Sequence, residues 1–354
     1  MDAPPIQYVK TSDGYDIAYN VGGNGRTLLM MPYPFSHARL SWTAPGLRET
    51  CVQLAGRFRV VHFDARGQGL STRGLADSHR LEDYLVDMEA VVGASNLDRF
   101  LLFGSVAFWR AAVVYAAKNS HRVGALILLN PDGSVAPSRP PQTTGSQNQN
   151  DWDTHLMMVG STVSAAPMDT SGRFSMRDRM KECVEQGDYS RMRQAFATCD
   201  LRGLLAQVNV PTLILSQRGP WNQATVPEVA AAIPSARLVM LEDFGNMLYS
   251  ASGETPGGIT AIEEFIDSLS ERNERHADEA LRSVPASMPI SASLSARQAE
   301  VLRLIGEGKT NREIAEALVL SERTVERHVA DIYARITVSN RAQAAVYAKE
   351  HGLV

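Results

Sequence analysis

The feature that most constrains the fold is an alternation of short apolar segments with helical segments over residues 1–270. The strand-like segments are short and mostly apolar, as buried strands should be, and lie at 27–31, 59–63, 99–103, 125–129, 212–216 and 237–241. Helical patterns at 81–94, 107–119 and 226–233 lie between most of them. Such alternation predicts a mostly parallel sheet covered by helices on both faces. Two earlier segments, 6–9 and 16–19, flank Ser12-Asp13-Gly14 and predict a hairpin.

The interval from Asp132 to about Asp200 interrupts this alternation. It begins with a run rich in Pro, Gln and Asn and continues with helical sequence. Because it is far too long for a connecting loop, we expect an inserted cap at about 133–200, above the carboxyl ends of the strands.

The chain is also expected to contain a second domain, because 354 residues exceed an ordinary domain of roughly 100–200 residues. The stretch from Ser283 to Gln298 contains Pro285 and Pro289 among Ser and Ala, with no charge before Arg297, and is typical of an interdomain linker. We therefore expect a large unit at 1–270, a linker at 271–290 and a small unit at 291–354.

Charge and composition exclude several classes of protein. The net charge is −4, so the chain is no globally basic nucleic-acid coat, and residues 286–354 carry 9 basic and 8 acidic groups. Any binding of the small unit to an anionic polymer must therefore come from a local patch. Cys51, Cys183 and Cys199 have no metal-ligand spacing, and their odd number argues against a disulfide framework.

Targeting and cofactor signals are absent from the sequence as well. The first residues lack an apolar signal core, and no apolar run approaches the ~20 residues that span a bilayer. The histidines are scattered and form no metal motif. We expect a cytoplasmic protein with no membrane partner, no metal and no cofactor.

Three collinear segments of the large unit carry a family resemblance. They are Arg59–Thr72, with its Asp-x-Arg-Gly-x-Gly-x-Ser pattern, Asp98–Pro131 and Val210–Asn246. They are similar to the turn after the fourth strand, to the nucleophile segment and to the acid and histidine segment of the α/β-hydrolase superfamily. The resemblance covers roughly residues 5–270. It implies an α/β-hydrolase-like, mostly parallel sheet with an inserted helical cap.

The same resemblance places residues without catalytic chemistry at the family's catalytic positions. That chemistry needs a Ser at a sharp G-x-S-x-G turn, a His and a carboxylate. Here the three turn positions are Gly104, Val106 and Phe108. The position of the acid has no carboxylate and matches Pro220 best, and the position of the histidine is occupied by Asn246. Pro32-Tyr33 replaces the His-Gly pair that helps to form the oxyanion hole. Valine has no nucleophile, and as a β-branched residue it resists the positive φ of the turn. We expect no catalytic residues and no enzyme activity.

Other polar residues near these positions leave an alternative open. Ser105 adjoins the lost nucleophile and His37 is near the oxyanion loop, so a relocated Ser/His pair defines an active-hydrolase hypothesis. His62 is interpreted as a hydrogen-bonded core residue. Asp64 is interpreted as a turn-stabilising partner of the Arg66 segment.

What the resemblance leaves is a pocket beneath the cap, at the carboxyl ends of the strands. Its positions are mostly apolar or aromatic, which predicts an apolar or aromatic small-molecule ligand. The expected ligand-binding residues are Tyr33, Phe35, Ser105, Val106, Ala107, Trp152, Met157, Trp221, Asn246 and Met247, with Phe108, His155 and Met158 as further candidates.

The small unit has signals for four helices. Ser295 precedes the first helix, and Gly306 and Gly308 end it. Thr310 and Glu313 form a capping box for the second helix. Ser321 begins the third helix, and the fourth runs from about Asn340 to His351. Residues 294–354 resemble, almost end to end, the LuxR-type (GerE-type) helix-turn-helix domain, a small all-α four-helix domain. This resemblance implies binding to a double-stranded DNA operator.

In the third helix, Val325, Val329, Ile332 and Ile336 form one apolar stripe at spacings of 4, 3 and 4. The opposite face carries Arg323, Arg327, Ala330 and Ala334, flanked by Glu326 and Asp331, and suits the major groove. Family members often carry a basic residue where this chain has Glu326. The expected DNA-binding residues are Thr310, Asn311, Arg312, Ser321, Arg323, Thr324, Glu326, Arg327, Ala330 and Arg341.

Together these features predict a ligand-responsive DNA-binding transcriptional regulator with a non-catalytic hydrolase-like sensor unit. A homodimer is expected, with the fourth helix making the contact through Ala344, Ala345, Tyr347 and Ala348. Two alternatives remain: an active hydrolase that uses Ser105 and carries an accessory DNA-binding domain, and a hydrolase-like unit that serves only as a dimerisation platform.

Overall fold

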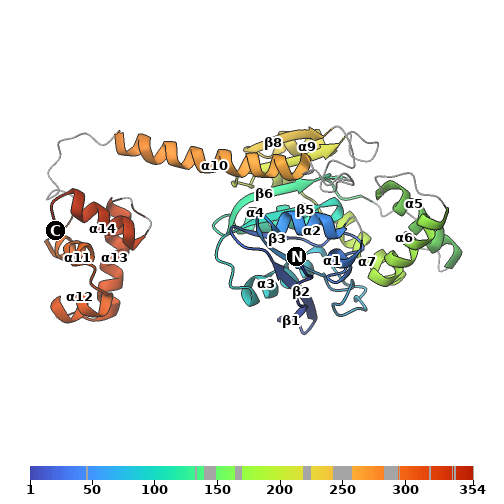
Figure 1. Cartoon of the computed structure of the whole chain (residues 1–354), viewed down its shortest axis with the longest axis horizontal. Helices are drawn as coiled ribbons and strands as arrows, with labels where there is room; N and C mark the ends of the chain where they lie inside the picture. The colour runs from blue at the N-terminus through green and yellow to red at the C-terminus, as the bar shows by residue number, and fades with distance from the viewer. Residues whose placement is uncertain are drawn as a thin grey trace. The chain divides into compact units, whose positions relative to one another are not determined.

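The computed structural model of the chain describes residues 1–44, 47–131, 134–138, 149–163, 170–217, 225–241, 257–282, 294, 296–318, 320–336, 338 and 340–353. The chain divides into two compact units, Met1–Glu271 and Arg272–Val354 (Figure 1). Each unit has its own core and is described by itself.

Unit 1 is built on one eight-stranded sheet. The strands are β1 (Gln7–Lys10), β2 (Asp16–Gly22), β3 (Thr27–Met30), β4 (Arg59–Phe63), β5 (Phe100–Ser105), β6 (Val123–Leu129), β7 (Thr212–Gln217) and β8 (Ala236–Leu241). Their order is β1-β2-β4-β3-β5-β6-β7-β8, and only the β1–β2 and β2–β4 pairs are antiparallel. The expected hairpin and the mostly parallel sheet are therefore confirmed.

Helices cover both faces of this sheet, because strand side chains alternate between its two sides. They are α1 (Leu40–Thr43), α2 (Leu47–Ala55), α3 (Leu81–Ala94), the 3₁₀ turn η1 (Val106–Phe108), α4 (Trp109–Lys118), α8 (Arg202–Leu205), α9 (Thr225–Ala232) and α10 (Gly257–Arg282). In β5, Leu102 joins a core with α3 and α4, whereas its neighbour Phe103 joins a second core with α2 and α10. The buried apolar side chains of the sheet therefore form two core layers, one packed against α3 and α4 and the other against α2 and α10.

The interval between β6 and β7 forms a helical cap, as the sequence predicts. It contains α5 (Gln149–Val163), α6 (Thr170–Cys183) and α7 (Gln186–Ala197), with α7 nearest to the sheet (Figure 1). The buried Asp188 carboxylate of α7 accepts hydrogen bonds from the backbone N–H groups of Gly74 (2.9 Å) and Leu75 (2.8 Å). The Gly69 N–H donates to the Cys183 carbonyl at 2.7 Å. The loop after β4 therefore anchors the cap.

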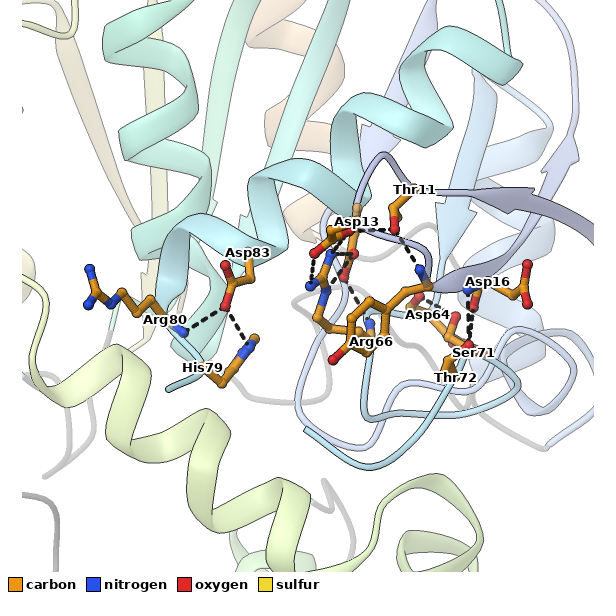
Figure 2. A network of polar contacts seen from close by, with 12 residues as sticks. Thr11, Asp13, Asp16, Asp64, Arg66, Ser71, Thr72, His79, Arg80 and Asp83 are labelled. Carbon is orange, nitrogen blue, oxygen red and sulfur yellow. Dashed lines mark hydrogen bonds and ion pairs between the residues drawn. The ribbon is translucent and has the colours of Figure 1, made fainter. Parts of the chain in front are cut away.

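That loop is itself held by buried acidic groups (Figure 2). Asp64 Oδ2 accepts from the N–H groups of Ala38 and Leu70, both at 2.9 Å, and Oδ1 accepts from Ser36 Oγ at 2.9 Å. Arg66 donates to Asp87 Oδ1 at 2.8 Å. The carboxylate of Asp64 thus joins the loop after β3 to the loop after β4. Asp64 therefore has a structural role.

After the end of α10, the described part of unit 2 contains four helices, as expected. They are α11 (Ala296–Gly306), α12 (Asn311–Leu318), α13 (Glu322–Ile336) and α14 (Arg341–Glu350). The predicted caps of α12 and α13 form: Thr310 and Glu313 bond reciprocally, with Thr310 N–H to Glu313 Oε2 at 2.7 Å, and the Thr324 N–H donates to Ser321 Oγ at 3.2 Å. Ser295, predicted before the first helix, lies outside the described residues. Capping explains why α12 and α13 begin where they do.

The segment 271–290, predicted as a linker, begins as helix. Residues 271–282 are the end of α10, and residues 283–293 lie outside the described part. The sequence explains the helix, because Glu271 stands four residues before Arg275 and Asp278 four before Arg282, a favourable helical spacing of opposite charges. In the described part of the chain, no helix is both long enough and apolar enough to cross a membrane.

The Asp64 carboxylate predicts unequal effects of two glycine substitutions. Gly69 and Gly74 both have positive φ, but a Cβ on Gly69 would lie 2.1 Å from Asp64 Oδ2, whereas a Cβ on Gly74 meets nothing within 4 Å. Gly74→Ala should lower the free energy of unfolding by about 1–2 kcal/mol through backbone strain. Gly69→Ala should cost roughly 1–3 kcal/mol more through overlap. Urea unfolding measures both; equal losses would contradict the structural role of Asp64.

Candidate ligand pocket and nucleic-acid interface

The turn that follows β5 keeps a strained conformation around Val106. Val106 has φ of +48° and a side chain exposed to 38%. A positive φ is rare for a β-branched residue and costs of order 1–3 kcal/mol. As a β-branched residue, valine is predicted to resist this conformation, yet the turn retains it. The residue presented at this turn is therefore one whose side chain contains no nucleophile.

The neighbours of Val106 show what holds the turn. A Cβ on Gly104 would lie 2.6 Å from the Ala112 Cβ, so only glycine lets α4 pack this closely on β5. Phe108 is fully buried, with its ring centroid 5.0 Å from that of Tyr84 and 4.9 Å from that of Phe196. The position where the hydrolase pattern has a second glycine thus holds an aromatic ring that joins the turn to cap helix α7.

The alternative nucleophile, Ser105, lies on the buried side of the same turn. Ser105 is 5% exposed, and within the described residues no hydrogen bond joins it to His37. His37 Nδ1 instead accepts from the N–H groups of Arg39 (3.3 Å) and Leu40 (3.4 Å). Burial lowers the pKa of His37. The structure therefore does not bring Ser105 and His37 together as a catalytic pair.

His62 is a core residue, as the sequence analysis interprets it. It is 2% exposed, and its Nε2 lies 3.2 Å from Ser36 Oγ. Burial lowers the pKa of His62, because the interior disfavours the charged imidazolium.

The remaining predicted pocket residues fall in three groups. Phe35, with φ of +69°, is buried and stacks on Tyr189 of α7 at 5.1 Å between ring centroids. Trp152 of α5 is buried against the same tyrosine at 5.2 Å. Tyr33, Ala107 and Met157 are half-buried, and Met158 is exposed. Trp221, Asn246 and Met247, as well as Pro220, lie outside the described residues.

Sequence reasoning missed the residues of α7 that meet the strand ends. Tyr189, Met192 and Phe196 are all buried and recur at spacings of 3 and 4, which is the signal of one apolar helix face. Tyr189 contacts Phe35, and Phe196 contacts Phe108. Helix α7 therefore covers the carboxyl ends of β3 and β5. Within the described ranges, no group of three or more His, Cys, Asp or Glu side chains could hold a metal ion.

In unit 2, α13 has the two faces that the sequence predicts. Val325, Val329 and Ile332 are buried and Ile336 is half-buried. The opposite side is solvent-exposed and carries Arg323, Glu326, Arg327, Ala330 and Asp331. The side chain of Ala334 lies outside the described residues. α13 thus presents two arginines and a small residue on an accessible face.

Four of the predicted DNA-binding residues, Thr310, Asn311, Arg312 and Arg341, gather at the start of α12. Arg341 Nη1 donates to Asn311 Oδ1 at 2.9 Å, and Arg341 also bonds the Lys309 carbonyl. Arg312 is exposed and pairs with Glu316 at 3.1 Å. Hydrogen bonds from Thr310 lower the pKa of Glu313, whose charge complements the positive end of the α12 dipole. Arg341 therefore belongs to the same surface as α12, although it comes from α14.

The predicted dimer contact through α14 is partly wrong. Ala344 and Ala348 are fully buried in the core of unit 2 itself, because α14 packs on α11. They are therefore not available to a partner. Val346, which the sequence analysis did not name, is 52% exposed on this helix.

Comparison with known protein families places both units. Residues 36–250 match the family described as alpha/beta hydrolase fold. Residues 292–348 match the family described as bacterial regulatory proteins, luxR family. The first match spans more than half of the chain. The protein belongs to the α/β-hydrolase fold family and carries a C-terminal helix-turn-helix domain of the luxR family.

Individual relatives match one unit each. The transcriptional regulatory protein LiaR of Bacillus subtilis is 50% identical over 62 residues, 18% of this chain and 29% of that protein. The transcriptional activator protein SolR of Ralstonia nicotianae is 47% identical over 64 residues, 18% and 27% respectively. This chain thus spans less than a third of these two relatives.

Solved structures resemble unit 1. An esterase from Rhodococcus sp. ECU1013 has a TM-score of 0.60 at 17% sequence identity, and the match covers 75% of this chain and 99% of the esterase chain. A hydrolase from Pseudomonas aeruginosa has a TM-score of 0.58 at 21% identity, covering 75% and 98%. At such identities the likeness shows the fold alone.

The strained turn predicts a stabilising substitution. Val106→Gly should raise the free energy of unfolding by about 1 kcal/mol, since glycine adopts positive φ without strain and the valine is substantially exposed. Thermal denaturation should report this as a rise of roughly 2–4 °C. The control is Val86→Gly in α3, where glycine in a helix should lower stability by about 1 kcal/mol. A loss of stability in both variants would mean that the turn is not strained.

Proposed function

We propose that this protein is a ligand-responsive, DNA-binding transcriptional regulator. Its hydrolase-fold unit binds an apolar small molecule without hydrolysing it, and its luxR-type domain binds a double-stranded operator as part of a homodimer. The observation that carries the proposal is Val106 at the turn after β5, in a chain that also has a luxR-type domain.

The turn supports binding without turnover. Acyl transfer needs a nucleophile at the turn and a base within hydrogen-bond reach. Val106 supplies neither, and the neighbouring Ser105 is buried. What the surroundings supply is a set of buried aromatic side chains, Phe35, Trp152 and Tyr189. An aromatic and apolar environment of this kind suits retention of an apolar molecule.

The exposed side chains of α13 support operator binding. Arginine can donate two hydrogen bonds to the edge of a guanine, and a small residue lets the helix approach the bases closely. Arg323 and Arg327 have no acidic partner among the described residues, so neither must be released from an ion pair before it contacts DNA. The α12 surface with Arg312 then suits the phosphate backbone.

A ligand can regulate the operator only if it binds the DNA-competent and incompetent states with different affinities. The cap supports such a role, because it meets the strand ends through α7 and would enclose a ligand there. A shift in operator affinity of about 5–150-fold is the usual range of such coupling. A unit that bound ligand with no such shift would be a passive dimerisation platform.

Substitutions in unit 2 should separate base reading from phosphate contact. With an operator enriched from random-sequence DNA, Arg327→Ala in the full chain should weaken binding by about 1–3 kcal/mol and relax the base preference. Arg312→Ala should weaken all sequences alike and lower the salt slope by roughly one. Electrophoretic mobility shifts at several salt concentrations measure both.

Arg303→Ala is the matched control for these substitutions. It removes the same charge from α11, where Arg303 pairs with Glu307, and should leave operator binding unchanged. Unchanged binding of Arg327→Ala to the preferred operator would refute the assignment of the DNA-facing side of α13.

The absence of a nucleophile at Val106 predicts no esterase activity. The purified protein should hydrolyse 4-nitrophenyl acetate and butyrate no faster than heat-denatured protein, measured by release of nitrophenolate. Saturable turnover that Ser105→Ala abolishes would instead support the active-hydrolase alternative.

A further inference from the structure

Two cap helices share an aromatic cluster with one cation. His155 of α5 lies with its Nε2 3.2 Å from the Tyr189 hydroxyl of α7, and Trp152 stacks on the His155 ring at 5.8 Å between centroids. Arg193 lies one turn after Tyr189, with its guanidinium 5.9 Å from the tyrosine ring centroid and its Nη1 3.5 Å from the hydroxyl. We call these four residues the α5–α7 cluster.

Arg193 differs from Arg177 and Arg191 of the cap in having no acidic partner among the residues that the structure describes. Arg177 pairs with Asp178 at 2.7 Å, and Arg191, two residues before Arg193, pairs with Asp77 at 2.8 Å. For Arg193, by contrast, the described residues provide only the contacts with Tyr189. The guanidinium is half-buried, and a cation partly removed from water without a counter-ion is costly. The cluster therefore has an unmatched positive charge.

The imidazole of His155 is a neutral polar group close to the Arg193 cation. Burial, followed by the nearby Arg193 cation, lowers the pKa of His155, so the ring is neutral near pH 7. A neutral imidazole has one N–H group. When Nε2 accepts the Tyr189 proton, that N–H is at Nδ1, and the described residues offer it no acceptor. The cluster then holds a second donor beside the guanidinium.

The α5–α7 cluster adjoins the apolar surface of the proposed pocket. Tyr189 stacks on Phe35 of the loop after β3, and the same helix reaches the Val106 turn through Phe196 and Phe108. A ligand whose polar end meets Arg193 can therefore place an apolar body against aromatic rings.

We propose that the α5–α7 cluster is the polar end of the ligand site and that it binds the carboxylate of a monocarboxylic acid with an apolar or aromatic body. The inference deepens the proposed function and rests on it. One guanidinium neutralises one negative charge, so a half-buried site favours a monoanion over a dianion such as a phosphate ester. The planar fork of arginine also matches a carboxylate with two parallel hydrogen bonds.

The test compares acids with their neutral counterparts on the full chain. The probes are 4-phenylbutyrate and the straight-chain acids from hexanoate to dodecanoate, each beside its primary amide. Binding is followed by tryptophan fluorescence, since Trp152 is part of the cluster, and by thermal shift. At least one acid should bind about 10- to 100-fold more tightly than its amide, the usual effect of a hydrogen bond to a charged group.

Substitutions on α7 assign this preference to one side chain. Arg193→Gln should bring the affinity for the acid down to that for the amide and leave the amide unchanged. Arg193→Lys, which keeps the charge but loses the fork, should retain part of the preference. Arg191→Gln is the matched control, because it removes the same charge from the same helix, and it should leave the preference intact. Melting temperatures verify that each variant is folded.

Equal binding of acids and amides by the wild type would overturn the inference, and so would an acid preference that survives Arg193→Gln. Operator affinity measured with each bound probe distinguishes this failure from failure of the proposed function. Amides that bind and shift operator affinity would leave the proposed function standing without the carboxylate site. Acids that bind through Arg193 without any shift would keep the site and refute the regulation. Failure of every probe to bind would count against both.

Discussion

The buried carboxylate of Asp64 joins the two loops on which the candidate pocket depends. It receives hydrogen bonds from Ser36 and Ala38 after β3 and from Leu70 after β4. The loop after β4 then anchors the cap through Gly74 and its neighbours. Because buried acceptors of this kind are costly to leave unsatisfied, both loops and the cap are fixed together. The position of α7 over the strand ends follows from this arrangement.

The turn after β5 keeps a strained backbone although Val106, the residue with positive φ, has no nucleophilic side chain. Gly104 still permits the close approach of α4, and Val106 still adopts a positive φ. Phe108 then packs with Tyr84 and Phe196, which adds aromatic packing between the turn and the cap. The strained turn is thus embedded in the packing of the surrounding core.

The two units use charge in different ways. In the cap of unit 1, Arg177 and Arg191 are each matched by carboxylates, whereas the described residues offer Arg193 none. In unit 2, Arg323 and Arg327 on the exposed face of α13 have no acidic partner in the described part of the chain. A cation without a carboxylate partner is suited to an anionic ligand, which is DNA for Arg323 and Arg327 and a carboxylate for Arg193 in the proposals above.

The sequence by itself determined the sheet, the cap, the four helices of unit 2 and the exposed face of α13, because these follow from local periodicity and capping. Only the tertiary structure decided which cap residues meet the strand ends, since the contacts of Tyr189 with Phe35 and His155 join segments far apart in sequence. It also placed Ala344 and Ala348 in their own core, because a small residue on a helix fits either an interface or an interior. Whether an arginine is paired likewise depends on neighbours that sequence spacing does not specify.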